Sequence, residues 1–232
     1  VTGLKADGIW SKMKAIYPMV GGTASSHKYN LIDPQDTDGA FRLDFNGGWT
    51  HSANGALPNG SNAYADTHFI ENNELSINDE HISAYLRTNI NGVNVSTLYC
   101  DIGTFSSSTV TTNMFVRHGG KAYFRVQDSE AGPAATSTDS RGFWVANRVS
   151  SSETRNRRNS TLITQTRSSN GLSQQPFYIG AARGNNSNPN TTSYYSKRET
   201  AFNTIGEGLT DTESSNLYTR VQAFQTSLSR NV

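Results

Sequence analysis

The last thirty residues constrain the fold of this chain more than any other stretch. An apolar run ends at Ile205, and Gly206 and Gly208 interrupt it, which indicates a strand followed by a turn. Thr210 and Glu213 then have the spacing of a capping box, which satisfies the first free amides of a helix. Apolar residues follow at helical spacing, at Leu217, Val221, Phe224 and Leu228. We therefore expect a strand that ends at Ile205, then a glycine turn, and then an amphipathic helix over residues 211–229.

The rest of the chain consists of short strand-like runs separated by turn residues. These runs fall at 26–31, 41–45, 63–67, 82–88, 96–102, 113–117, 122–127, 142–148, 153–157, 162–167 and 176–181. Such spacing is typical of β-sandwiches and barrels. The chain has 232 residues, of which 20 are glycine and only 17% are charged, and all-β sandwiches of this length commonly form one domain. We therefore expect an all-β fold and a single domain over residues 1–232.

A helical pattern stands near the start of the chain. Ile9, Met13 and Ile16 recur at helical spacing, Asp7 precedes them as a cap, and Pro18 follows them. We therefore expect a helical lead-in within residues 1–25 that packs on the sandwich.

The totals exclude several classes of partner. A net charge of +1 does not favour nucleic-acid binding, which needs a concentrated basic surface. No apolar run approaches the roughly 18 residues that a membrane span requires. Cys100 is the single cysteine, so we expect a small buried hydrophobe and no intramolecular disulfide. The chain begins at Val1 without a signal pattern, and we take it for a processed product or a fragment.

Three internal segments fit the same picture as the C-terminal unit. Asn59–Thr67 is a turn that leads into a strand, Gly142–Arg148 with Glu153–Thr164 is a hairpin, and Pro176–Ala181 reads P-F-Y-I-G-A. In this order they resemble the concanavalin A-like, laminin-G-like family of lectin and glucanase sandwich domains, over residues 41 to 232. The resemblance implies a jelly-roll sandwich of two antiparallel sheets, with short helices near the N- and C-termini.

A second resemblance covers nearly the whole chain. The segments that carry it are Trp10–Pro18, Gly21–Ala24, Ala40–Leu43 and Gly47–Ser52. They resemble modules found in tailed-bacteriophage virion proteins. This resemblance implies a place in the virion, on the extracellular surface of the particle. It also implies that other virion subunits are partners and that the module is a homo-oligomer.

The catalytic patterns of enzymes with this fold are absent. A glucanase would carry Glu-x-Asp-x-x-Glu along one strand, so that its carboxylates share one face. No such run occurs, and Glu71, Glu74 and Glu80 fall in a loop-like segment. Residues 194–199 supply the side-chain types of a polysaccharide lyase without the strand patterns of that family. We therefore expect no catalytic residues, and the alternative is a polysaccharide lyase or glycoside hydrolase of the same fold.

Metal-ligand patterns are weak as well. The histidines, at positions 27, 51, 68, 81 and 118, have no zinc-binding spacing. Asp33, Asp36 and Asp38 alternate like part of a calcium loop, but the sixth and twelfth positions of an EF-hand would hold Asp38 and Asp44 instead of Gly and Glu. We expect no cofactor and no dedicated metal ligands, and leave open a structural Ca²⁺ held by loop carboxylates and carbonyls.

Four arginines gather on one expected hairpin. Arg155 and Arg157 share a face by strand alternation, and Arg158 and Arg167 lie nearby. We favour a solvated face that protects an edge strand. The alternatives are contact with acidic glycans or with an acidic neighbouring subunit.

The candidate glycan-binding surface is local to two sharp turns, at residues 47–48 and 59–60. Turns at the ends of a sandwich present side chains without burying their backbone. The candidate residues are Trp49, His51, Asn62, Tyr64 and Asp66. Trp49 offers an aromatic face, while Asn62 and Asp66 offer hydrogen bonds to sugar hydroxyls. The alternative is that Trp49 and Tyr64 fill the sandwich end as core.

These observations favour a non-enzymatic virion module that is structural and adheres to glycans, with host-surface polysaccharide as the ligand. A purely architectural role in the particle is the other reading.

Overall fold

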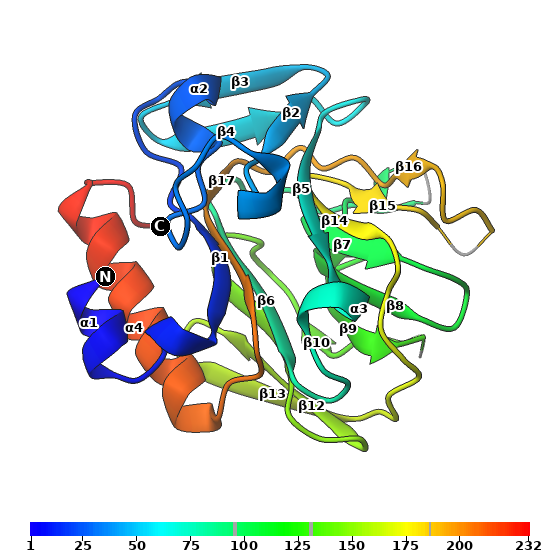
Figure 1. The fold of residues 1–232 in the computed structure, drawn as a ribbon. Helices are drawn as coiled ribbons and strands as arrows, with labels where there is room; N and C mark the ends of the chain where they lie inside the picture. The colour runs from blue at the N-terminus through cyan, green and yellow to red at the C-terminus, as the bar shows by residue number, and fades with distance from the viewer. Residues whose placement is uncertain (95–96, 130–131, 186) are drawn as a thin grey trace.

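The computed structural model describes residues 1–94, 97–129, 132–185 and 187–232. Two β-sheets with mostly antiparallel pairing pack face to face as a sandwich, and the helices lie outside them (Figure 1). The expected all-β jelly-roll class with short terminal helices is therefore confirmed.

The smaller sheet has eight strands among the described residues. Their order is β13 (Thr161–Thr166), β12 (Glu153–Arg158), β11 (Gly142–Arg148), β6 (Glu80–Leu86), β17 (Thr200–Gly206), β4 (Gly55–Pro58) and β3 (Trp49–Ser52), with β1 (Met13–Tyr17) also paired to β17. The strand predicted over 142–148 agrees with β11 at both ends.

The larger sheet has nine strands among the described residues. Their order is β10 (Ala135–Thr136), β9 (Lys121–Asp128), β8 (Thr111–His118), β7 (Ile102–Phe105), β14 (Pro176–Ile179), β5 (Tyr64–Ile70) and β2 (Asp44–Asn46). In addition, β15 (Ala182–Arg183) pairs with β7, and β16 (Thr192–Ser193) pairs with β15.

Three apolar clusters hold these layers together. The largest lies between the sheets and includes Phe69, Phe124 and Trp144. The second lies between the smaller sheet and the terminal helices, and the third is a small cluster around Cys100 on the outer face of the larger sheet. Cys100 is fully buried and free, as expected of a small hydrophobe.

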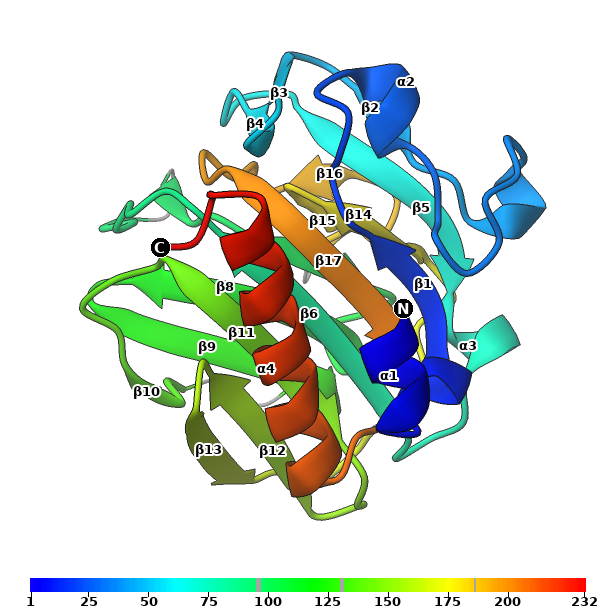
Figure 2. The same ribbon diagram turned by 90° about the vertical axis from the view of Figure 1, so that its left-hand side faces the viewer.

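The C-terminal helix α4 (Asp211–Ser227) lies across the outer face of the smaller sheet, with α1 (Thr2–Ala6) beside it (Figure 2). The capping box between Thr210 and Glu213 is present. Leu217 and Val221 are buried, as predicted, and Phe224 is partly buried. Leu228 ends the helix and is 42% exposed, so it does not belong to the packed face.

The helix expected over residues 9–17 is wrong. A 3-10 turn spans Trp10–Lys12, and β1 then pairs with β17. Both sides of β1 are buried, because Tyr17 faces the core between the sheets while Met13 and Ile16 face the helices. Apolar residues on both sides of a strand imitated the spacing of one helical face.

The strand expected over 26–31 is also wrong. Thr23 and Ser26 form a capping box, which starts the short helix α2 (Ala24–His27). Asn30 then accepts from Ile16 N (2.9 Å) and donates to Lys14 O (3.1 Å), so a side-chain amide contacts the free edge of β1 where a strand would otherwise pair.

Two further boundaries differ from expectation. The strand expected over 96–102 starts at a residue outside the described ranges, and its described part makes only one bridge, at Cys100, before β7 begins. The expected strand over 41–45 is reduced to β2, because Phe41 takes a left-handed backbone conformation after the 3-10 turn Asp38–Ala40.

A further helix, α3 (Glu71–Glu74), follows β5 directly. Within the described ranges, no helix combines the length and the apolar character of a membrane span.

Candidate functional site

Strand β5 positions two of the predicted residues together. Its side chains alternate, so that Ala65 and Phe69 enter the core while Tyr64, Asp66 and His68 face outward from the sandwich. Asp44 on β2 lies directly opposite Asp66 in the register of the sheet. The outer face of this sheet edge therefore combines one aromatic ring with several polar side chains.

The ring of Tyr64 is supported from below. It stacks on Tyr178 of β14 with ring centroids 4.5 Å apart and an interplanar angle of 21°. Tyr178 is 5% exposed, and Arg183 lies over its ring at 5.8 Å. Tyr178 and Asp66 are hydrogen-bonded, and burial together with the Asp66 charge raises the pKa of Tyr178 to about 12. Tyr64 is half-buried and is thus the exposed layer of a supported aromatic stack.

The Asp66 carboxylate is partly shielded from solvent. Its carboxylate accepts from His68 N at 2.8 Å. Burial raises the pKa of Asp66, although the contacts with His68, Tyr178 and Arg183 oppose that rise. The group can accept hydrogen bonds from a ligand while its own position stays fixed.

Trp49 lies at the same end of the sandwich but is not a freely exposed platform. Its indole Nε1 donates to Asn46 O (3.0 Å) and Tyr64 O (3.3 Å), and its ring packs on the core between the sheets. A Cβ at Gly180 would lie 2.7 Å from Trp49 Cη2, so this turn needs glycine. The half-buried Trp49 fits the core alternative more closely than a sugar platform, and its part in binding stays a prediction.

His51 is paired with another histidine. The Nδ1 atoms of His51 and His27 are 2.9 Å apart, and Gly22 N donates to His27 Nε2 at 3.2 Å. The neutral His27 ring therefore carries its proton on Nδ1 and donates it to His51. Burial lowers the pKa of both rings, that of His27 to about 4. This pair ties α2 to β3, which leaves less of His51 for a ligand.

Asn62 is exposed, and its Oδ1 joins two turns. It accepts from Gly48 N at 3.1 Å and from Asn59 Nδ2 at 2.7 Å. Gly47 approaches Asn62 O so closely that a Cβ there would lie 2.1 Å away. The two turns that the sequence singled out therefore pack on each other beside the start of β5.

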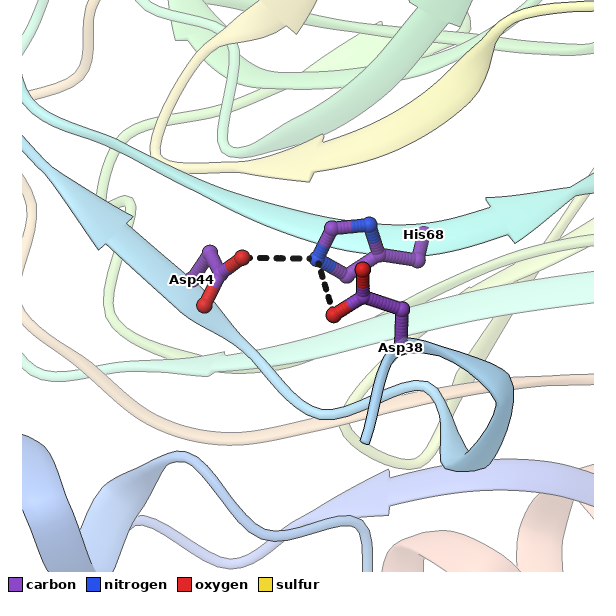
Figure 3. A group of neighbouring side chains, drawn as sticks. All are labelled: Asp38, Asp44 and His68. Carbon is purple, nitrogen blue, oxygen red and sulfur yellow. Dashed lines mark hydrogen bonds and ion pairs between the residues drawn. The ribbon is translucent and has the colours of Figure 1, made fainter. Parts of the chain in front are cut away.

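A charged cluster lies next to Asp66 on the same edge, between Asp38, Asp44 and His68 (Figure 3). His68 Nε2 is 3.0 Å from Asp44 Oδ2 and 3.5 Å from Asp38 Oδ1. Arg42 bonds both carboxylates at 2.8 Å and also reaches Asp36. The cluster joins the 33–38 loop to β2 and β5.

These three ligand atoms lie within 4.8 Å of one another, and a His with two carboxylates suits a transition metal better than Ca²⁺. Arg42 already compensates both carboxylates, however, so a metal would have to displace a guanidinium. We assign the cluster to loop attachment. Asp33 accepts from Gln35 Nε2 at 2.9 Å, and a structural Ca²⁺ held by loop oxygens stays a prediction.

The carboxylates weighed for catalysis do not line an open surface together. Glu71 and Glu80 are fully buried between the sheets, and no sugar can reach them. Asp44 and Asp66 face each other across β2 and β5, but Arg42 and His68 engage Asp44. The Asp44 carboxylate is therefore already engaged by two basic side chains.

The arginines of the 153–167 hairpin stabilise the fold instead of forming a solvated face. Arg155 pairs with Asp211, and Arg157 bonds Ser214 Oγ and Asp211 O, so both attach α4. Arg158 lies over the Trp144 ring at 4.9 Å. Arg167 is buried beside Asp128. Predicted contacts of this hairpin with acidic partners are therefore unsupported by its geometry.

Sequence reasoning missed the residues that support the β5 face. Tyr178, Arg183, Asp44 and His68 were not among the candidates, although alternation in β14 would have placed Tyr178 on the side opposite to the buried Phe177. Nothing local indicates that Tyr178 lies under Tyr64, because the two residues are distant in the chain.

No protein-family model matches the sequence, and no curated protein matches it. Solved structures match in fold. Domain 4 of AbnA, a GH43 extracellular arabinanase from Geobacillus stearothermophilus solved with arabinotriose, aligns with a TM-score of 0.54 and 10% identity, over 89% of this chain and 98% of that domain. The binding domain of botulinum neurotoxin serotype D aligns with a TM-score of 0.55 and 10% identity, over 92% of this chain and 53% of that one. A Trypanosoma rangeli sialidase aligns at 0.52 and 11%, over 77% and 29%.

These likenesses show that the chain has a β-sandwich fold similar to that of the arabinanase domain and of parts of the neurotoxin binding domain and the sialidase. The chain spans about half of the neurotoxin domain and less than a third of the sialidase, which are longer chains. At such low identity the likeness establishes the fold, and function rests on the residues themselves.

Proposed function

We propose that this chain is a non-enzymatic bacteriophage virion module, structural and glycan-adhering, whose binding surface is the outer face of β5. The observation that carries the glycan part is the stack of Tyr64 on Tyr178 next to the ordered carboxylate of Asp66. An aromatic ring contributes apolar contact to the C–H face of a sugar, and a fixed acceptor beside it binds a hydroxyl. The fold it shares with an arabinanase domain solved with arabinotriose is consistent with this role.

The virion part rests on the sequence resemblance to tailed-phage modules. Other virion subunits would be its partners, in a homo-oligomer on the particle surface. Repeated copies would convert a weak single site into firm adhesion to host-surface polysaccharide through effective concentration.

Binding is tested with the purified chain on an array of bacterial surface polysaccharides. We expect Tyr64→Ala to reduce binding by about tenfold, since aromatic contacts of this kind contribute on the order of 1 kcal/mol or more. Tyr218→Ala is the matched control, because Tyr218 is another half-buried tyrosine, on α4 at the outer face of the smaller sheet. Equal binding by wild type and Tyr64→Ala, with unchanged melting temperature, would refute this site.

Two further measurements address the remaining parts. Peptides of the chain should be found by mass spectrometry in banded phage particles, and their confinement to the unassembled lysate would contradict a virion role. A bound polysaccharide should release no reducing ends or unsaturated products; release that stops in Asp66→Asn would support the lyase or hydrolase alternative instead.

A further inference from the structure

We propose that a second sugar-binding hollow lies at the β8–β9 end of the larger sheet and accepts one acidic, carboxylate-bearing sugar residue. The lining residues are Leu98, Phe115, His118, Tyr123 and Arg125, around a volume of about 180 Å³. This inference deepens the proposed glycan adhesion and rests on it. The hollow shares the outer face of the sheet with Tyr64 but lies on β8 and β9, which are three and four strands away from β5 in the sheet and are green in Figure 1.

The register of the sheet constructs the hollow. Phe115 of β8 lies directly opposite Tyr123 of β9, and Asn113 lies opposite Arg125. Side chains opposite one another on an antiparallel pair share a face, so a ring pair and a polar pair stand side by side. Leu98, from the segment before β7, closes one wall.

The rings are held in place from outside. Phe115 is 2% exposed and forms the floor, with Tyr194 edge-on to it at 5.6 Å. His118 packs against Tyr123 at 6.2 Å. A volume of 180 Å³ equals that of about six liquid waters, which suits one sugar ring and not an extended chain.

The charge of the hollow identifies the ligand class. Among the described residues, its lining includes two basic side chains, Arg125 and His118, and no acid. Residues 102–127, which form β7, β8 and most of β9, also contain Arg117 and Lys121 but no Asp or Glu, and the flanking Asp101 and Asp128 are paired with Arg198 and Arg148. A carboxylate that enters would meet the guanidinium of Arg125, and charge-assisted hydrogen bonds of this kind are stronger than neutral ones.

Two further observations favour an anionic occupant. Burial lowers the pKa of Arg125, although the Asp128 charge opposes this, and burial and nearby Arg198 lower the pKa of His118, so both would gain from a bound anion. Asn113 is fully buried outside the lining of the hollow, and its Oδ1 accepts from Arg125 Nη1 at 3.5 Å, which helps to hold the guanidinium in place.

The test uses D-glucuronate and D-glucose, which differ at the carboxylate, with binding followed by NMR on the intact chain. We expect D-glucuronate to bind about tenfold or more tightly than D-glucose. Its affinity should fall as salt is added. D-glucuronate should also raise the pKa of His118, read from the imidazole C2–H resonance of the wild-type protein. Equal affinity for the two sugars, or an unchanged His118 titration, would overturn the proposal.

Variants locate the contact. Arg125→Gln should lose about tenfold or more of the D-glucuronate affinity. Arg141→Gln should lose none, because Arg141 is an exposed arginine paired with Asp139 elsewhere. If Arg125→Gln fails to fold, Tyr123→Ala replaces it, since Tyr123 is only half-buried.

Tyr64→Ala separates this inference from the proposed function. That variant should keep D-glucuronate binding while losing polysaccharide binding at β5. If the wild-type protein binds polysaccharide but not D-glucuronate, the proposal for the hollow alone is refuted. If the wild-type protein binds neither, the proposed glycan adhesion is refuted as well.

Discussion

A buried pair of carboxyl groups makes the stability of this protein depend on pH. Glu71 begins α3 and Glu80 begins β6, and both are fully buried between the sheets. Glu71 accepts from Ser173 N at 2.7 Å, and Glu80 accepts from Thr112 Oγ1 at 3.2 Å. The Glu71 charge acts on Glu80, and the Oε1 atom of each has no hydrogen-bond partner among the described residues. A protonated carboxyl therefore costs less here than a charged one.

The sign of the effect follows from the direction of the pKa shifts. Burial raises the pKa of Glu71 from 4.5 to about 7, while burial and the Glu71 charge raise that of Glu80. Below pH 4.5 both the folded and unfolded chains are protonated, so this stability is fully present. As pH rises the unfolded chain releases its protons first, and stability is lost up to the folded pKa. For Glu71 alone, a pKa raised from 4.5 to about 7 corresponds to about 3 kcal/mol.

We expect Glu71→Gln to remove this loss, because a Gln side chain does not titrate and its amide oxygen can still accept from Ser173 N. Urea unfolding between pH 5 and pH 8 should show the wild type losing about 3 kcal/mol relative to the variant, a large share of typical stability. His27 and His81 have lowered pKa values of about 4 and act in the opposite direction, but equally in both proteins. Parallel pH profiles for the two proteins would show that burial does not raise the pKa of Glu71.

The packing of the fold yields three more predictions. In urea unfolding, Leu217→Ala should lower the free energy of unfolding by about 2–5 kcal/mol, whereas Leu228→Ala, at an exposed position, should lower it by less than about 1 kcal/mol. Equal losses would contradict the packing of α4. Arg198 and Asp101 form a fully buried ion pair at 2.7 Å, so Arg198→Met should lower the free energy of unfolding by about 3–5 kcal/mol. An unchanged free energy of unfolding would show that the Asp101 charge is compensated elsewhere. Gly55→Ala would place a Cβ 2.3 Å from Thr200 O at a positive φ, so its melting temperature should fall and the amides of β4 should lose protection in hydrogen exchange.

The sequence predicted those elements of the fold that depend on interactions between residues close together in the chain. The capping box and the Leu217–Val221 spacing predicted α4, because both act within one or two turns of helix. The sharp turns at 47–48 and 59–60 led us to expect Tyr64 and Asp66 on one surface, and alternation along β5 brings both to its outer side. The same reasoning failed over residues 9–17, where burial on both sides of β1 depends on two layers that are distant in the chain.

In the candidate site, too, some features depend on residues close in the chain and others on residues that are distant in the chain. Sequence alone determined an all-β sandwich, a capped closing helix, and turns that present Asn62, Tyr64 and Asp66, since turn chemistry and two-residue periodicity are local. Only the tertiary structure decided that Tyr178 lies under Tyr64 and that Trp49 packs inward. Pairings between distant strands depend on sheet register, and no local run of residues carries that information.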